Sequence, residues 1–417
     1  MLRPLLVRLH RYVGLSLAVF LTVVALTGSV IAFNEELDAL LNPQLFRAPA
    51  GGLPASADTV VRRIEHDYPG AQVTYIPLNT DPGKAVRLRV ESRGGGSVAF
   101  DEVFASASDG QALGTRKWGE CCLDARHLVP FLYRIHYTLL LPGNWGILFT
   151  GTVALVWFVD CIVGLALTLP RATPFWRNWR KAWVVKRGAS RLRIHFDLHR
   201  AAGLWLWLVL AMLAMSGVAM NLPAQVFRPV VSLFCEIRPS VEDTVANHSN
   251  STDEGQETRV TQTRPTLSFN DAITRAAQEA GRRNWSIHPQ YAFRLTHLHA
   301  YGVAFLRDGQ TPERGLGPSF FYLDDRSGAL LDSDIMAAGS AGDVFIQAQY
   351  PLHSGRIAGL PGRTLVSVTG LAVVLLTWTG IYIWLRKRRV AAAHLRREPS
   401  PARARGALAS VLPPRPS

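Results

Sequence analysis

Two apolar segments of the chain begin with the same residues and match one another along their length. LHRYVGLSLAVFLTVVALTG and LHRAAGLWLWLVLAMLAMSG place His10 opposite His199 and Gly28 opposite Gly217, at a constant offset. An imidazole in a segment of this kind is costly at membrane depth and usually marks function. Neutral imidazole is also a common axial ligand of haem iron. We therefore expect His10 and His199 to hold one haem between two helices.

A second pair of histidines occupies similar places in the two halves of the chain. Pro142-Gly143 matches Pro361-Gly362, and each step follows a histidine, His136 in RIHYTLLLPG and His353 in PLHSGRIAGLPG. The intervals from histidine to proline are not equal, so this match is approximate. The arrangement predicts a second haem held by His136 and His353. Both haems are expected to be b-type, because no C-x-x-C-H motif occurs. The alternative is that these histidines only form hydrogen bonds at the membrane surface.

Several residues beside the four histidines have two interpretations each. His195 lies one helical turn before His199, on the same helical face, and is a reserve ligand or a partner of a haem propionate. Arg11 and Arg200 directly follow candidate ligands and either anchor their helices on the cytoplasmic side or bind propionates. Asp160 is the one acid within the predicted spanning segments, and a hydrogen bond to a neighbouring helix is favoured over proton relay.

Histidine and cysteine also occur outside the predicted helices. His297 and His299 alternate in LTHLHAYG, where a strand would place both on one face, either as a metal or substrate site or as a solvated surface. Cys121 and Cys122 are adjacent, and an oxidising outer compartment would permit one bridge to Cys235. A vicinal redox pair is the other interpretation.

Four apolar segments are long enough to span a bilayer, which takes about 20 residues. They are Val13–Phe33, Trp145–Leu169, Gly203–Leu222 and Leu365–Leu385. Basic residues gather at the N-terminus, between residues 171 and 193, and at residues 386–389. Positively charged flanks stay in the cytoplasm, so both termini are expected there. The formal charge of +14 mostly records these flanks and does not indicate nucleic-acid binding.

The segments between the helices predict two outer domains. Each mixes strand-like runs, Ala85–Glu91 and Ser319–Leu323, with Gly and Asp turns, and the second also contains a helical run, Phe269–Gly281, with a cap at Asn270. Residues 242–264 have the composition of a flexible linker. We therefore predict an α+β membrane protein with internal duplication, a four-transmembrane-helix bundle and two periplasmic mixed α/β segments. The predicted boundaries are transmembrane helices at 1–33, 143–169, 198–222 and 362–386, periplasmic segments at 34–142 and 223–361, a cytoplasmic basic loop at 170–197 and a cytoplasmic disordered tail at 387–417.

The ordered set of motifs LHRYVGL, IHYTLLLPGNWG, DLHRAAGLW and LHSGRIAGLPGRTLVSVTG resembles the PepSY-associated transmembrane family. The resemblance covers the chain to about residue 389 and extends to the family's ferrioxamine reductase (FoxB-like) branch. It implies PepSY-like outer domains and an inner-membrane di-haem reductase that delivers electrons to ferric siderophores, hydroxamates favoured, and releases Fe(II). By this similarity His10, His199, His136 and His353 carry over as haem ligands. His136 departs mildly from the pattern, since Tyr-Thr-Leu follows it where Ser-Gly-Arg follows His353.

The source of electrons and the rival functions follow from what else the sequence contains. No Gly-rich dinucleotide fingerprint is present, so a quinol or a separate protein is expected to donate electrons. Tyr301, Tyr350 and Arg356 are candidates for the docking surface of the chelate. The alternatives are a non-catalytic membrane module that binds a peptide or partner protein, and a transporter, although four helices with one acid offer few polar groups for a path.

Overall fold

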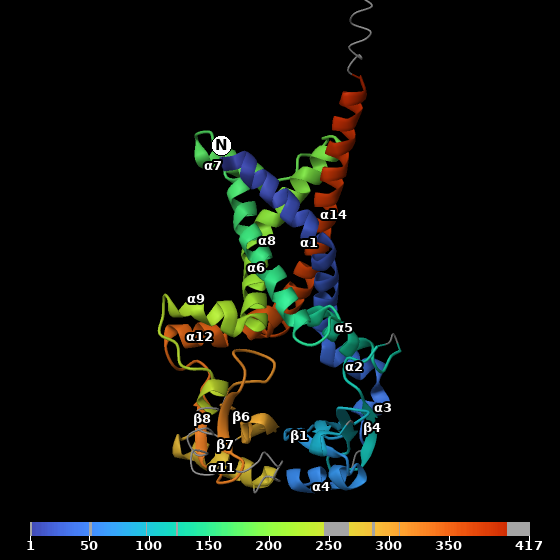
Figure 1. Ribbon diagram of the computed structural model, residues 1–417, viewed down its shortest axis with the longest axis vertical. Coiled ribbons are helices and arrows are strands. Elements are labelled where there is room, and N and C mark those ends of the chain that lie inside the picture. The colour runs from blue at the N-terminus through green and yellow to red at the C-terminus, as the bar shows by residue number, and fades with distance from the viewer. Residues whose placement is uncertain are drawn as a thin grey trace, which may run out of the picture. The chain divides into compact units, whose positions relative to one another are not determined.

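The computed structural model describes residues 2–49, 52–96, 98–121, 124–245, 267–285, 288–307 and 309–397. Four helices in these ranges are long and apolar enough to cross a membrane (Figure 1). They are α1 (Leu2–Ile31), α6 (Trp145–Thr168), α8 (Arg191–Asn221) and α14 (Leu360–Arg397). The protein is therefore a multi-pass membrane protein, as the sequence predicts.

Two of the long helices, α8 and α14, extend beyond their predicted limits at the ends that carry charge. Helix α8 begins at Arg191, well before the predicted start at residue 198, and its first turn is capped by the Ser190 hydroxyl, which accepts a hydrogen bond from the Arg193 amide at 3.4 Å. Apolar and basic residues alternate through this turn, so no breaker stops the helix. His195 and His199 consequently lie inside α8. Helix α1 likewise places His10 within a continuous helix.

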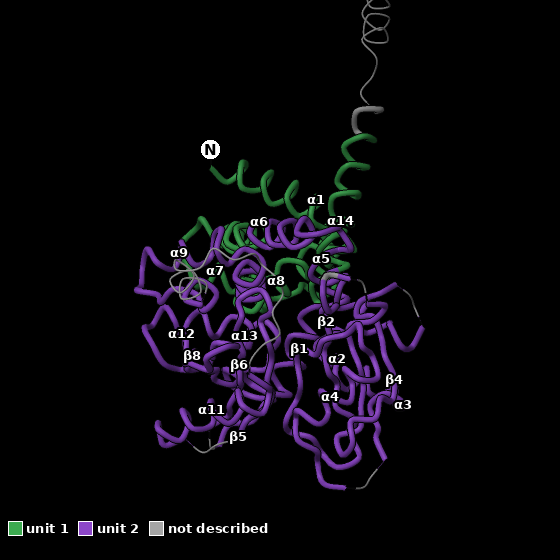
Figure 2. The backbone as a smooth tube through the Cα atoms, turned by 60° about the horizontal axis from the view of Figure 1, so that its bottom comes forward, with its two compact units in different colours: residues 1–23, 156–211, 371–417 green, residues 24–155, 212–370 purple. Residues whose placement is uncertain are grey.

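The chain divides into two compact units, and each long helix contributes one part to each (Figure 2). Unit 1 contains residues 1–23, 156–211 and 371–417. Unit 2 contains residues 24–155 and 212–370, and all the described strands belong to it. The short helices of unit 1 are α7 (Phe175–Trp179) and η2 (Arg180–Ala182).

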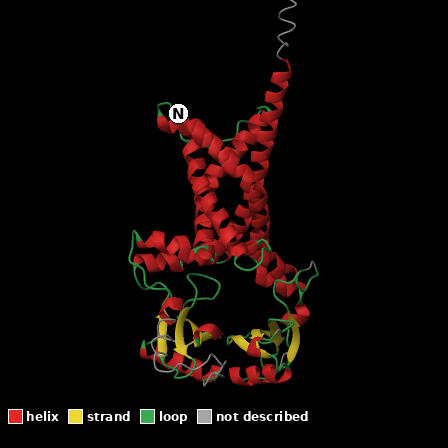
Figure 3. Ribbon diagram, viewed as in Figure 1, coloured by secondary structure: helices red, strands yellow, loops and turns green. Residues whose placement is uncertain are grey.

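A single eight-stranded antiparallel sheet carries both copies of the duplicated outer segment (Figure 3). The strands are β1 (Ala71–Pro77), β2 (Val86–Ser92), β3 (Glu102–Ala105), β4 (Ala112–Arg116), β5 (His288–Leu295), β6 (Ala300–Leu306), β7 (Ser319–Asp324) and β8 (Leu330–Asp334). Their order, β4-β3-β2-β1-β5-β6-β7-β8, joins two four-stranded meanders through β1 and β5. The predicted strands are confirmed in β2 and β7. The two outer segments share one sheet, because Tyr75 pairs in register with Phe293.

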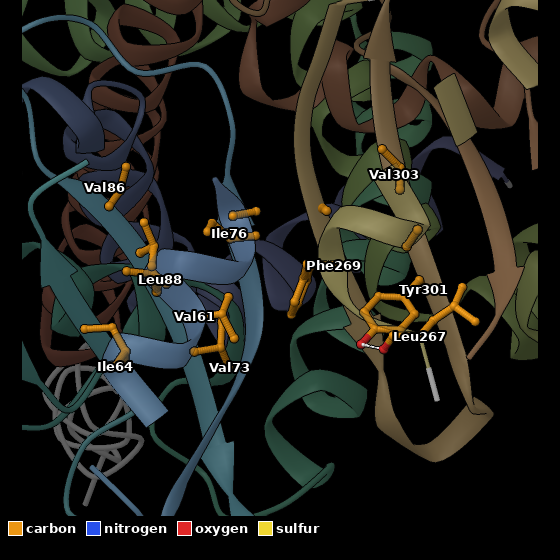
Figure 4. Packing of buried hydrophobic residues seen from close by; sticks show 14 of the residues in the cluster. Val61, Ile64, Val73, Ile76, Val86, Leu88, Leu267, Phe269, Tyr301 and Val303 are labelled. Atoms are coloured by element: carbon orange, nitrogen blue, oxygen red, sulfur yellow. Dashed lines mark hydrogen bonds between the residues drawn. The ribbon is translucent and has the colours of Figure 1, made fainter. Parts of the chain in front are cut away.

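One helix from each copy covers the same face of this sheet and builds its apolar core (Figure 4). Helix α4 (Ala57–Asp67) packs Val61 and Ile64 against Val73 and Leu88, and α11 (Phe269–Arg282) packs its apolar side on β5 to β7. The predicted cap at Asn270 is wrong: Ser268 caps α11 in a capping box with Asp271. The Ser268 hydroxyl accepts from the Asp271 amide, and the Asp271 carboxylate accepts from the Ser268 amide, so the pair satisfies two backbone amides.

Most of the remaining described short helices of unit 2 lie between the sheet and the spanning helices, whereas η1 (Arg93–Gly95) and η4 (Thr296–Leu298) lie between strands. The others are α2 (Asn34–Leu41), α3 (Pro43–Phe46), α5 (Leu128–Thr138), η3 (Pro223–Phe227), α9 (Arg228–Ser232), α12 (Ala341–Gln347), α13 (Gln349–Ser354) and η5 (Arg356–Ala358). Helix α2 is held by a buried ion pair between Asp38 and Arg116 of β4, with 2.7 Å between the charged atoms. Arg356 of η5 pairs with Glu35 at 2.8 Å, which ties the segment after His353 to α2.

Candidate functional site

The four candidate histidines form two pairs with nearly the same geometry. His10 of α1 and His199 of α8 lie in unit 1, with their ring centroids 6.1 Å apart and their planes at 62°. His136 of α5 and His353 of α13 lie in unit 2, with centroids 6.1 Å apart and planes at 64°. We call them the first and second histidine pairs. Each unit thus brings together the two histidines that the sequence repeats pair.

This spacing matches that of two imidazoles on opposite sides of one metal ion. An imidazole nitrogen binds a first-row metal at about 2 Å, and the ring centre lies about 1 Å beyond that nitrogen. Two rings on opposite sides of one iron therefore have centroids about 6 Å apart. The internal duplication accounts for the same distance and tilt occurring in both pairs. The residues of both pairs fit bis-histidine ligation of a haem.

Hydrogen bonds fix which nitrogen of each ring is available. His136 Nδ1 donates to the Val24 carbonyl at 2.9 Å, and His199 Nδ1 donates to the Leu376 carbonyl at 3.0 Å. His10 Nδ1 lies 3.0 Å from Asp160 Oδ1. A carbonyl or carboxylate oxygen can only accept, so Nδ1 carries the proton and Nε2 keeps its lone pair. This is how a metal-ligating histidine is oriented by its outer partner.

The fourth ring follows the same rule through a hydroxyl. His353 Nδ1 lies 2.9 Å from Ser216 Oγ, and that hydroxyl already donates its proton to the Met212 carbonyl at 2.7 Å. Its oxygen is therefore the acceptor for Nδ1. All four imidazoles are thus anchored through Nδ1.

Every ring of the four also lies against a glycine. A Cβ at Gly28 would meet His136 Cε1 at 2.9 Å, and one at Gly217 would meet His353 Cε1 at 4.0 Å. The corresponding contacts in unit 1 are Gly164 with His10 at 3.5 Å and Gly380 with His199 at 3.4 Å. Glycine lets a bulky group approach a helix backbone closely. Four glycines on four rings leave the histidines close to the helix axes, which is the packing that a flat macrocycle between the helices needs.

Burial keeps the second pair in the form that binds metal. Removal from water lowers the pKa of His136 to about 4 and that of His353 to about 3. Both rings are therefore neutral at pH 7, as an iron ligand must be.

The comparison with protein families agrees with this architecture. The sequence model of the PepSY-associated TM region matches residues 7–387. The chain belongs to this family. No curated protein matches the sequence closely enough to add a relative.

In this PepSY-associated protein, the four principal histidines form one pair in each unit, and the secondary candidates belong to neither pair. His195 stacks on Tyr382 with centroids 4.2 Å apart, and its Nδ1 donates to the Arg191 carbonyl. Arg200 binds Asp197 at 2.9 Å, and Arg11 is exposed. The reserve role of His195 and the propionate roles of the two arginines stay predictions.

Other sequence expectations are corrected by the fold. His297 lies in the 3-10 turn η4, and His299 adopts a left-handed backbone with a φ of 50°, so the two do not share a strand face. Tyr301 is 2% exposed and donates to the Leu267 carbonyl, which removes it from the surface (Figure 4). Cys235 is a free thiol, and Cys122 lies outside the described residues. Within the described ranges, no cluster of three or more His, Cys, Asp or Glu side chains is placed to hold a metal ion.

Two tyrosines beside the second pair were missed by the sequence analysis as neighbours of the histidines. Tyr133 and Tyr350 each lie three residues before a histidine of the pair, so each shares a helix face with it. Burial raises the pKa of Tyr133 to about 12, and Tyr350 and Arg356 lie close enough to act on it electrostatically. The matched spacing before His136 and His353 was the signal that could have identified them.

The sheet contributes a further aromatic pair to the same region of unit 2. Tyr75 of β1 contacts Tyr291 of β5 with ring centroids 5.3 Å apart, where the two repeats join. Burial raises the pKa of Tyr291, on which Tyr350 and Arg356 also act. Tyr133 and Tyr291, one from each repeat, therefore lie within electrostatic reach of Tyr350 and Arg356, which flank His353 in the sequence.

Proposed function

We propose that this protein is an inner-membrane di-haem reductase that passes electrons across the bilayer to ferric siderophores in the periplasm and releases Fe(II). The proposal rests mainly on the repeated ring geometry: in each of the two histidine pairs, the ring centroids lie 6.1 Å apart. His10 and His199 would hold one b-type haem, and His136 and His353 the other. A bound haem supplies reversible one-electron chemistry, which matches the one electron that separates Fe(III) from Fe(II).

The protein's own groups perform the remaining tasks. Helix backbone carbonyls and the Asp160 carboxylate orient the imidazoles, and the long apolar helices keep water from the ligands. Reduction weakens the hold of hard hydroxamate oxygens on iron, because Fe(II) is the softer ion. The substrate then loses its metal without any covalent step on the protein.

The chelate is proposed to dock beside the second pair. Tyr350 is 50% exposed and stands one helical turn from His353, with the Arg356 guanidinium nearby. Aromatic rings and a guanidinium offer stacking and hydrogen bonds to a metal chelate. A siderophore is too large to enter a packed helix bundle. Reduction of the bound iron at this surface is therefore favoured over entry of the chelate between the helices. Tyr350 and Arg356 were already predicted from the sequence for this role.

The orientation that this function needs has the basic flanks in the cytoplasm and the sheet of unit 2 in the periplasm. Electrons would come from a quinol or from a separate cytoplasmic protein, since the sequence carries no dinucleotide fingerprint. Membrane lipid surrounds the four long helices, whose apolar surfaces include exposed Val19, Trp205 and Leu208. A non-catalytic binding or regulatory module would leave the four anchored imidazoles without a purpose.

A visible spectrum of the purified, detergent-solubilised protein tests whether the protein binds haem, as the proposal requires. Bis-histidine haem gives a Soret band and sharp α bands that appear on reduction with dithionite. We expect about two haems per chain by the pyridine haemochrome assay, one for each bis-histidine pair. A colourless protein purified from haem-replete cells would overturn the proposal.

Reporter fusions test the orientation. Fusion at Gly95 is expected to give alkaline-phosphatase activity, because that residue lies in the predicted periplasmic segment, and fusion at Arg187 is expected to give none. The complementary cytoplasmic reporter should show the reverse pattern. Phosphatase activity at Arg187 would invert the topology and with it the direction of electron flow.

A glycine substitution tests the packing of the second pair. Gly28→Val is expected to remove most of one haem, because even the first added carbon lies 2.9 Å from His136 Cε1 and must displace the ring. Gly14→Val on the same helix is the matched control, since a Cβ there meets no atom within 4 Å. Equal haem content in both variants would show that the His136 ring does not need its position against α1.

A further inference from the structure

The two histidine pairs differ in one respect that the duplication makes visible. In the second pair, each ring contacts a neutral hydroxyl, Thr27 for His136 and Ser216 for His353, and His136 also donates to the Val24 carbonyl. The two hydroxyls occupy matching positions in the repeated helices α1 and α8. Their oxygens lie 3.3 Å from His136 Nδ1 and 2.9 Å from His353 Nδ1. The two ligands of this pair therefore receive nearly the same support.

In the first pair the equivalent positions hold different residues. Thr379 and Asp160 occupy matching positions in the helices that follow the two PG steps, and each contacts the histidine of the neighbouring helix. Thr379 Oγ1 lies 3.1 Å from His199 Nδ1, whereas Asp160 Oδ1 lies 3.0 Å from His10 Nδ1. A carboxylate thus stands in one repeat where the other has a hydroxyl. It is the one anchor among the four that can carry a charge.

The surroundings of Asp160 preserve the effect of that carboxylate. Its side chain is 11% exposed, on a spanning helix. Among the described residues, His10 is the only basic side chain within ion-pair distance of it. No lysine or arginine in those ranges therefore neutralises the carboxylate, and water screens it little.

A carboxylate that accepts from Nδ1–H makes the imidazole a stronger electron donor to a metal at Nε2. A stronger donor and a nearby negative charge both favour the oxidised, more positive iron over the reduced one. We infer that Asp160 gives the His10–His199 site the lower reduction potential of the two. If His10 and His199 held one haem and His136 and His353 the other, an electron on the first would pass downhill in energy to the second, oxidising the first and reducing the second by one electron. This inference rests on the proposed function and adds a direction to it.

A potentiometric titration followed by visible spectroscopy tests the order of the two sites in the full-length protein. The wild type is expected to titrate in two waves, and the lower wave should be missing in His10→Ala and present in His136→Ala. Asp160→Asn keeps the size of the side chain and removes its charge. It should raise the lower wave by the equivalent of about tenfold in the equilibrium between the sites, about 59 mV for one electron, and leave the upper wave in place.

Three further variants distinguish the effect of the Asp160 charge on the reduction potential from the effect of changed side-chain packing. Asp160→Thr copies the residue at Thr379 and should also raise the lower wave, whereas Asp160→Glu keeps the charge and should not. Thr377→Val is the matched control, because it removes a hydroxyl that bonds Thr22 at 3.1 Å without touching a histidine. The inference is overturned if the lower wave belongs to the His136–His353 site, or if Asn and Thr at position 160 leave both waves unmoved. Absence of haem from the wild type would instead overturn the proposed function.

Discussion

Alanine at His10 or His199 is expected to remove one haem of the two and leave the other. The two ligands of this site lie in unit 1, and those of the second site lie in unit 2, each with its own anchors. Losing one of two axial nitrogens leaves the iron with a single protein ligand, which costs most of the bound haem. Alanine at His136 or His353 should remove the other haem in the same way. Pyridine haemochrome content, about halved in each variant, measures the effect.

The control for this experiment is His195→Ala. His195 stacks on Tyr382 and bonds a backbone carbonyl of its own helix, so both haems should remain. Loss of both haems from every single variant would indicate a shared or differently paired site. Haem content that is unaltered in His199→Ala would make His195 the ligand instead.

The second large effect is expected on mixing the reduced protein with its substrate. Protein reduced by dithionite and freed of excess reductant should reoxidise when a ferric hydroxamate is added, with one Fe(II) trapped by ferrozine for each haem oxidised. His136→Ala should abolish this transfer, because the docking surface lies beside the second pair. Tyr350→Ala should keep its haem and raise the chelate concentration needed for half-maximal rate by about tenfold, the effect of one lost aromatic contact.

A panel of ferric chelates tests whether the reduced protein transfers electrons to any substrate of the proposed class. Ferric hydroxamates, catecholates and citrate should be compared at equal iron, with Tyr382→Phe, on a different helix and in unit 1, as the matched tyrosine control. Haems that stay reduced with every chelate would contradict the reductase proposal. The di-haem assignment would then stand without its substrate.

The periodic features of the sequence were sufficient to predict the membrane helices and the duplication. Four apolar segments became α1, α6, α8 and α14, because length and hydropathy decide whether a helix can cross a bilayer. The constant offsets between the repeats paired His10 with His199 and located the PG steps. Two strands and the helix α11 were also correctly placed, since strand alternation and helical spacing are local signals, although the cap of α11 was assigned to the wrong residue.

Contacts between distant residues were decided only by the tertiary structure. The sequence marked Asp160 as an unusual acid, but not as the partner of His10, because 150 residues separate them. It predicted two outer segments, but not that β1 and β5 join them in one sheet, since strand pairing depends on which edges meet. The turn at His297 and the burial of Tyr301 were missed for a similar reason. The alternating pattern does not predict the left-handed backbone of His299, and the tyrosine ring is covered by Phe269 of α11, which lies far from it in the sequence. Spacing along the chain identified the groups able to ligate iron, and packing decided which of them face each other.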